Sequence, residues 1–332
     1  DCTNSFNDMT LNFTIHRTKY NWQICLFILL SYAAHAQQDA QFSLFNQNTL
    51  YNNPATAGSS GRTQIQLAHR TQYVGYKTTN MDQGGALSTQ MLSYSMPIKN
   101  FGFGISAISD KSTVRNNQDI KLAASYFIPA GGGKLYFGVG AGIFRQALDY
   151  GPLRPEEEED PLILSGKKSE MKPDLNAGIQ YVSDAFHVGL SMTHLLKPQF
   201  SLGSTTATNP LPPTAYLNAG VNLAVGYAVQ VQPMVLVKSD LNTLSVEGGA
   251  SVTIKDTYWV GATYRHQDAY LIAMAGVYLL QDQSLRLSGA YDFVASGKKE
   301  KSPSSLEVML TYSLPNIKVG KKTIIRTPRF RF

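Results

Sequence analysis

Ser191 and His194 are residue types that serve as a nucleophile and its general base, and they lie three residues apart. A nucleophile and its base must come within hydrogen-bond reach of each other. Two residues three apart on one strand point to opposite faces of the sheet. We therefore expect no hydrolase site at this pair, and the sequence predicts a protein that is not an enzyme.

The histidines and acidic residues show no ligand spacing. His69, His187, His194 and His266 are dispersed along the chain. The acidic run at residues 156–160 could bind calcium or a basic partner. No Gly or Asn is interleaved to give the spacing of a cation-binding loop, so a solvated charge cluster is the favoured interpretation. We expect neither a metal nor another cofactor.

Polar side chains recur at alternate positions within otherwise apolar stretches. They are expected on the face opposite the apolar side chains, where they pair with one another or line water. The residues concerned are Arg70, Gln72, Lys121, Arg265, Arg286, Asp292 and Glu307. They are compatible with either a filled interior or a small channel.

Gly138, Gly140 and Gly142 share one face of a predicted strand. They are no nucleotide-binding motif, because no phosphate-binding helix N-terminus follows. Glycines inside a strand often mark a place where another segment packs close to the backbone. The N-terminal segment is a candidate for that neighbour.

The elements that must position these residues are short strands. From residue 62 onward, apolar and polar side chains alternate with period two, most clearly over 119–128, 285–293 and 306–314. Turn signals divide the chain into fourteen predicted strands. They are 62–75, 84–96, 101–109, 119–128, 133–148, 173–183, 185–193, 215–225, 227–238, 243–253, 257–267, 269–280, 284–293 and 305–314. An even number lets an antiparallel barrel close its last strand on its first.

The connectors alternate in length along the chain. Those after even-numbered strands are tight, whereas the long ones, such as 149–172 and 194–214, follow odd-numbered strands. Outer-membrane barrels have short periplasmic turns and longer outer loops. This pattern predicts that both mature termini lie in the periplasm.

A soluble β-sandwich or a lipocalin-like barrel would show the same alternation with its apolar side chains facing inward. Three features favour a transmembrane barrel instead: an export signal, the strand number and aromatic residues near strand ends. The aromatic residues are Tyr126, Tyr264, Tyr291 and Tyr312. After residue 36 no apolar run approaches the roughly 20 residues of a transmembrane helix.

The start of the chain reads as a secretory signal peptide. An apolar run at 24–30 follows basic residues and precedes Ala34-His35-Ala36, which predicts cleavage before Gln37. Residues 1–8 read as an over-extended start. The run is too short for the alternative, an N-terminal membrane anchor. Both cysteines fall in this leader, so the mature chain contains none.

The end of the chain is strongly basic within a chain of net charge +6. Six cations occur in the last fifteen residues without an acidic neighbour, which suits an acidic partner surface. They are Lys318, Lys321, Lys322, Arg326, Arg329 and Arg331.

Short motifs in order along the chain resemble the PorP/SprF-like outer-membrane proteins of the type IX secretion system and its gliding machinery. The motifs are Gln38-Asp39-Ala40-Gln41-Phe42-Ser43, Asn53-Pro54-Ala55-Thr56-Ala57-Gly58 and Arg70-Thr71-Gln72-Tyr73-Val74-Gly75, followed by 101–104, 134–138, 173–178, 188–191, 305–313 and 328–332. The signature residues implied by this likeness are Asn53, Pro54, Ala55, Gly58, Arg70, Gln72 and Gly75. The likeness covers essentially the whole mature chain.

The resemblance implies a non-enzymatic accessory barrel that binds or anchors a secreted surface protein. Its expected partners are a secreted cargo or adhesin, or its C-terminal domain, at the outer loops, periplasmic secretion components, and outer-membrane lipid, but not nucleic acid. The alternative is an outer-membrane channel or transporter for small solutes. The expected parts are a leader (1–36), a periplasmic or plug-like segment (37–61), the barrel (62–314) and a basic periplasmic tail (315–332).

Overall fold

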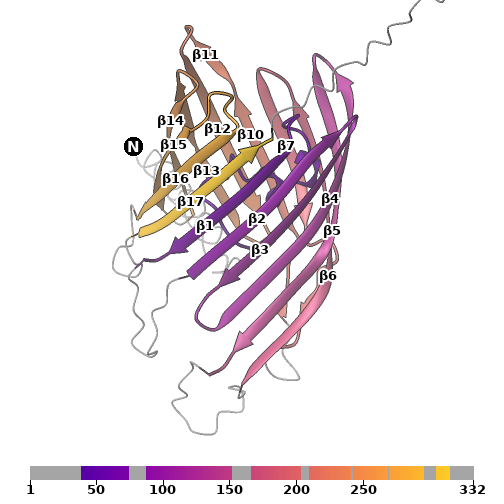
Figure 1. Ribbon diagram of the computed structural model, residues 1–332. Helices are drawn as coiled ribbons and strands as arrows, with labels where there is room; N and C mark the ends of the chain where they lie inside the picture. Colours follow the sequence, from indigo (N-terminus) through magenta and orange to yellow (C-terminus); the bar gives the residue numbers. More distant parts are fainter. Residues whose placement is uncertain are drawn as a thin grey trace, which may run out of the picture.

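The protein folds into a closed antiparallel β-barrel (Figure 1). The computed structural model describes residues 39–74, 87–151, 166–202, 209–240, 242–267, 269–294 and 304–314. The predicted leader, its cleavage site, Gly75, the acidic run at 156–160 and the basic tail lie outside these residues. In the part that is described, no helix is long and apolar enough to cross a membrane.

The wall contains fourteen strands, as the alternation predicts. β10 and β11 pair with the same neighbour, β12, and β8 and β9 pair only with each other. The first seven wall strands are β1 (Gln64–Gln72), β2 (Leu87–Ile98), β3 (Phe101–Lys111), β4 (Arg115–Ala130), β5 (Gly133–Asp149), β6 (Lys167–Val182) and β7 (Phe186–Thr193). The others are β10 (Thr214–Val221) with β11 (Leu223–Val225), β12 (Val229–Ser239), β13 (Leu244–Ile254), β14 (Tyr258–Arg265), β15 (Tyr270–Tyr278), β16 (Leu285–Val294) and β17 (Ser304–Ser313).

The wall closes at two places that strand order alone would leave open. β1 pairs with β17, so the first strand joins the last. β10 pairs with β12, which completes the ring on the other side. A closed ring leaves no unpaired sheet edge along its length, which is the requirement for a sheet in lipid.

The wall presents its apolar face outward. On β4, Leu122 is 61% exposed, whereas its neighbour Lys121 is buried. On β5, Val139 is 65% exposed, and the tyrosines predicted near strand ends also face outward. A soluble sandwich or lipocalin-like barrel would bury these side chains, so the outward apolar face identifies a membrane barrel.

The two ends of the barrel differ as the connector lengths predict. We call the end that carries connectors 73–86, 150–166, 194–213 and 295–303 the loop end, and the opposite end the turn end. Connector 149–172 is shorter than predicted, because β6 begins at Lys167 and pairs with β5 up to Asp149. Connector 194–214 contains two short strands that the alternation did not predict, β8 (Gln199–Phe200) and β9 (Asn209–Pro210).

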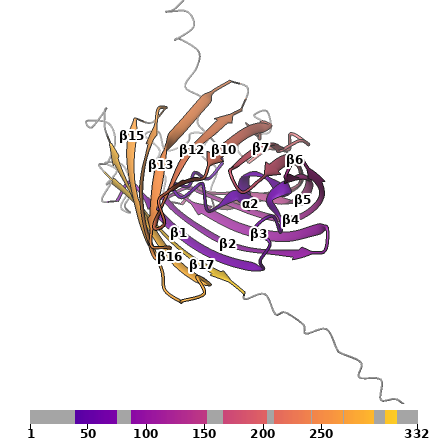
Figure 2. The same ribbon diagram turned by 90° about the horizontal axis from the view of Figure 1, so that it is seen from above.

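Residues 39–61, which we call the inner segment, lie inside the ring of strands as far as Gly58 (Figure 2). The segment contains one helical turn, α2 (Thr49–Asn52), and the short 3-10 helix η1 (Pro54–Thr56). Its apolar side chains, such as Phe42 and Leu44, form the core of the molecule together with inward-facing Met309 and Ile272. The barrel therefore has its hydrophobic core between this segment and the wall.

Candidate functional site: the lumen and its inner segment

The inner segment runs nearly the length of the lumen. Asp39 contacts His194, which follows β7 at the loop end, at 2.8 Å. At the other end of the segment, the backbone nitrogen of Gly58 donates to Ser95 Oγ near the turn end of β2, at 2.8 Å. β1 begins shortly afterward at Gln64. The segment thus enters the lumen from the side of the long connectors and leaves it at the turn end.

A buried ion network holds the middle of the segment to the wall. Arg70 on β1 pairs with Asp292 on β16 at 2.6 Å and with Glu307 on β17 at 3.2 Å. Glu307 also accepts hydrogen bonds from the backbone nitrogens of Ser43 at 2.6 Å and Leu44 at 3.2 Å. All three charged groups are at most 1% exposed. Removing Arg70 would leave two buried carboxylates without their shared cation, which is far more costly than losing an exposed pair.

Arg265 on β14 extends this network around the wall. Its guanidinium pairs with Glu247 on β13 at 2.7 Å and lies 4.0 Å from Asp292. It also donates to the backbone oxygen of Phe42 at 3.4 Å. Charged groups from five wall strands therefore converge on residues 42–44 of the inner segment.

A second cluster holds Asp39 near the loop end. His194 lies between Asp39 at 2.8 Å and Asp174 at 2.9 Å, and the hydroxyl of Tyr216 donates to Asp39 at 2.8 Å. Burial alone would lower the pKa of His194, but the two carboxylates raise it to about 9. Burial alone would raise the pKa of Asp39, but His194 beside it holds that pKa well below its usual range. The protonated imidazolium therefore forms an ionic contact with Asp39.

Lys121 on β4 is a further cation of this second cluster. Its ammonium group pairs with Asp119 at 2.7 Å and lies 3.9 Å from Asp174. It also lies 5.6 Å from the ring centre of Tyr51 on the inner segment. The predicted lumen residues Arg70, Lys121, Arg265, Asp292 and Glu307 all occur in these two clusters.

The Asn53–Gly58 turn packs directly against wall glycines. Asn53 caps η1, because its Oδ1 accepts from the backbone nitrogen of Ala55, and Asn53 Nδ2 donates to the backbone oxygen of Ile179 on β6 at 3.1 Å. A Cβ at Gly138 would overlap the backbone of residues 54 and 55, and one at Gly102 would overlap Ala57. The wall positions that contact this turn are glycines, so the turn packs directly against the strand backbone.

The prediction that the N-terminal segment packs against Gly138, Gly140 and Gly142 is correct at one of these positions. Gly138 lies against the inner segment, as expected. At Gly142 the close neighbour is the backbone of β4 at Ile120 and Lys121, and at Gly140 a Cβ would meet Asn176 Nδ2 at an ordinary 3.4 Å. Gly178 on β6, which the sequence did not single out, is a further close approach, because a Cβ there would overlap Asn53.

The expectation that Ser191 and His194 point to opposite faces is wrong. β7 ends at Thr193, and His194 adopts a positive φ of 56°, so both side chains turn into the lumen. The hydroxyl of Ser191 donates to the backbone oxygen of Asn52 at 2.6 Å, while His194 contacts the two carboxylates. Both residues therefore hold the inner segment.

Two small cavities lie between the inner segment and the described wall. These lumen cavities, one beside Phe42 and Glu247 and one beside Asp39 and Lys238, measure about 20 and 10 Å³. Each is about the size of one water molecule. Toward the loop end, Phe200, Leu202 and Leu211 pack on inward-facing Phe144.

Comparison with known proteins gives a family match over most of the chain. The model of the family described as "Type IX secretion system membrane protein PorP/SprF" matches residues 34–312. A comparison with the curated proteins found no match.

Solved structures similar to this chain are outer-membrane barrels at low sequence identity. The toluene transporter TbuX of Ralstonia pickettii is 11% identical, with 80% of this chain and 92% of that chain covered and a TM-score of 0.48. A Pseudomonas aeruginosa FadL homologue is 13% identical, covering 80% and 93%, with a TM-score of 0.48. Acinetobacter baumannii Omp33 is 7% identical, covering 76% and 99%, with a TM-score of 0.44.

The family match covers the inner segment as well as the wall, from residue 34 to residue 312. It includes the Asn53–Gly58 turn and the network around Arg70, the two features that define the lumen. With its fourteen-strand barrel, the chain belongs to the PorP/SprF family of type IX secretion system membrane proteins.

Proposed function

We propose that this protein is a non-conducting anchor in the outer-membrane part of the type IX secretion and gliding apparatus. Its outer loops would hold a secreted surface protein or that protein's C-terminal domain. The observation that carries the proposal is the inner segment inside the lumen, which Glu307, His194 and Ser191 hold to the wall. A segment with so many directional contacts favours a rigid scaffold over a solute path.

The loop end supports the docking role by its construction. Binding residues in proteins are concentrated on loops that a rigid scaffold positions. Here the long connectors 150–166 and 194–213 lie at one end of a closed, internally braced barrel. The basic tail at 318–332 would then contact an acidic periplasmic component.

Conductance measurements on the purified full chain in planar bilayers test the non-conducting role. We expect no steady single-channel current, and as a control the Gly138→Val variant, which displaces the turn at Ala55, should show openings. Steady current from the unchanged protein would overturn the anchor in favour of a solute channel.

Co-purification from native membranes tests the partners separately. Deleting residues 318–332 should reduce recovery of periplasmic components while leaving the barrel heat-modifiable on gels and the surface cargo bound. Shortening the loop at 150–166 should reduce recovery of the surface cargo and leave recovery of the periplasmic components unchanged. Unchanged recovery of both partners from both variants would contradict the docking role without bearing on conductance.

A further inference from the structure

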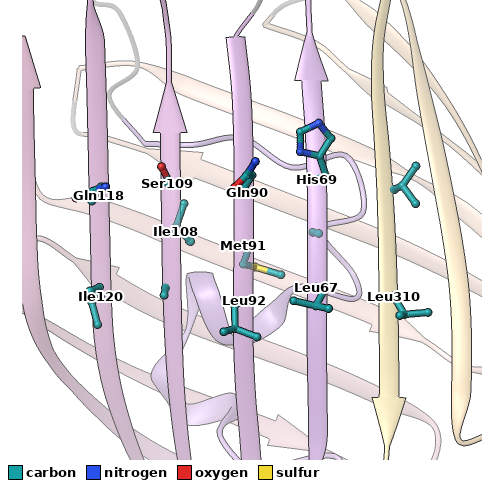
Figure 3. Close-up of a pocket in the computed structure, with 13 residues that line it drawn as sticks. Leu67, His69, Gln90, Met91, Leu92, Ile108, Ser109, Gln118, Ile120 and Leu310 are labelled. Carbon is teal, nitrogen blue, oxygen red and sulfur yellow. The ribbon is translucent and has the colours of Figure 1, made fainter. Parts of the chain in front are cut away.

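The outer surface of the wall carries polar side chains in an unexpected place. On β1 to β4, His69, Gln90, Ser109 and Gln118 are successive partners in register and share the outward face. Figure 3 shows this row directly beside an apolar row on the same strands. The apolar row is Leu67, Leu92, Ala107 and Ile120.

At the height of the polar row along the barrel, the outward face of the adjoining strand β17 carries apolar side chains. On β17, Val308 is opposite His69 and Leu306 is opposite Thr71, and both are exposed to the outside. Polar side chains that face lipid are costly unless they have partners, and this cost decreases only toward the interface. The row therefore suits a ligand whose polar part meets the wall at this level.

A recess of about 670 Å³ accompanies the two rows. The small side chain of Ala107 lies between Leu92 and Ile120, so the outer surface is hollowed where its neighbours are large. We call this recess the outer trough. The outer trough opens on the lipid-facing surface, so a ligand would enter it from the membrane. Its apolar row suits contact with an acyl chain.

A cationic recess adjoins the trough on the side of the loop end. It measures about 240 Å³ and is lined by Lys111, Arg115, Arg145, Lys167 and Lys168, with Asp149 as its one carboxylate. Arg145 joins the two recesses, because its guanidinium donates to Gln118 Oε1 in the polar row at 3.0 Å and to Ser169 Oγ at 3.2 Å. Lys167 is paired with Asp149 at 2.9 Å, which leaves the recess with an excess of positive charge.

From this arrangement we infer a binding site for a phosphate-bearing membrane lipid on the outer face of β1 to β6. An acyl chain fills the outer trough, the amide and hydroxyl groups of the polar row contact the head group, and the phosphate lies among Lys111, Arg145 and Lys167. Charge complementarity favours a phosphorylated lipid over a neutral one, since guanidinium and ammonium groups bind phosphate oxygens strongly. This site is independent of the anchoring role proposed above.

Lipid binding to the delipidated full chain in neutral detergent tests the site. The probes are bisphosphorylated lipid A, the same lipid with its phosphates removed, and inorganic phosphate, with bound ligand read by native mass spectrometry. Arg145→Gln and Lys111→Gln should each weaken lipid A binding about fivefold. Ala107→Phe, which fills the trough from its outward face, should weaken lipid A binding without affecting inorganic phosphate.

Lys99→Gln is the matched control, because Lys99 is exposed on the same β2–β3 hairpin as Lys111 but at the turn end. It should leave lipid binding unchanged, and all variants should remain heat-modifiable. The site is overturned if the dephosphorylated lipid binds as tightly as lipid A. It is equally overturned if Lys99→Gln weakens binding as much as Arg145→Gln, or if inorganic phosphate alone binds as tightly as the lipid.

Discussion

Arg70 and Glu307 are partners in register on the first and last strands of the barrel, and their side chains pair at 3.2 Å inside the lumen. The same Glu307 carboxylate accepts hydrogen bonds from the backbone nitrogens of Ser43 and Leu44. The seam that closes the wall is therefore also the site that holds the inner segment. Closure of the barrel and filling of its lumen are coupled through one carboxylate.

Replacing Arg70 with Met should destabilise the barrel by about 3–5 kcal/mol, because Glu307 would remain buried without its cation and Asp292 would keep only the Arg265 cation, at 4.0 Å. The measurement is the temperature at which the folded form converts to the unfolded form on a semi-native gel. The triple variant Arg70→Met, Asp292→Asn, Glu307→Gln should recover part of the loss, since no uncompensated charge remains. A triple variant less stable than Arg70→Met alone would show that the charges are not the cause.

Gly138→Ala should loosen the inner segment, because the new Cβ would overlap the backbone at Ala55. Overpacking of this kind costs about 1–3 kcal/mol. Gly140→Ala is the matched control on the same strand and face, where the nearest atom is 3.4 Å away, and its effect should stay within about 0.5 kcal/mol. Protease cleavage within residues 39–61 reports the difference, and equal cleavage of the two variants would argue against close packing at Ala55.

The wall was predictable because period-two alternation is a local signal. Each strand repeats it: the predicted strand 305–314 appears as β17 shifted by one residue, and the predicted strand 119–128 appears within the longer β4, which extends from Arg115 to Ala130. Which face points outward was not local information. It follows from the exposure of residues such as Leu122 against the burial of Lys121.

The lumen site was predictable in its residues but not in its pairings. Arg70 and Glu307 are polar residues at inward positions, yet they are 237 positions apart in the chain and meet only because β1 closes on β17. Asp39 and His194 carried no signal of their contact, because the turn after Thr193 reverses the direction that strand parity assigns to His194. Pairings between distant strands depend on closure, which the sequence pattern does not specify.

The contact between Asp39 and His194 should make the start of the inner segment sensitive to alkaline pH. The pKa of His194 is raised from 6.5 to about 9, so the contact contributes its full stability below about pH 6.5 and loses it as pH rises through 9. The groups facing this pair are Asp174, Lys121, Lys238, Asp119, Tyr51 and Tyr216. Hydrogen exchange of the amides at residues 39–45, corrected for intrinsic rates, should rise between pH 7 and pH 9.5.

The His194→Gln variant isolates this pH effect. Gln cannot carry the charge, so its exchange at residues 39–45 should be fast already at pH 7 and should lack the additional step at alkaline pH. The amides of β4 next to Lys121 serve as an internal reference, since they belong to the wall ladder. A pH step of the same size in both proteins would assign the titration to a group other than His194.

The position of Asp39 also bears on the predicted cleavage before Gln37. Asp39 lies within the lumen beside His194 and Tyr216, close to the loop end, with its side chain at most 6% exposed. A leader still attached to it would have to continue past these buried contacts, so we expect the protein isolated from outer membranes to begin at Gln37. Intact mass measurement gives the N-terminus directly. Ala36→Lys, which removes the small residue at the cleavage site, should retain the leader and slow assembly of the heat-modifiable barrel, and an unchanged mass for this variant would place the cleavage elsewhere.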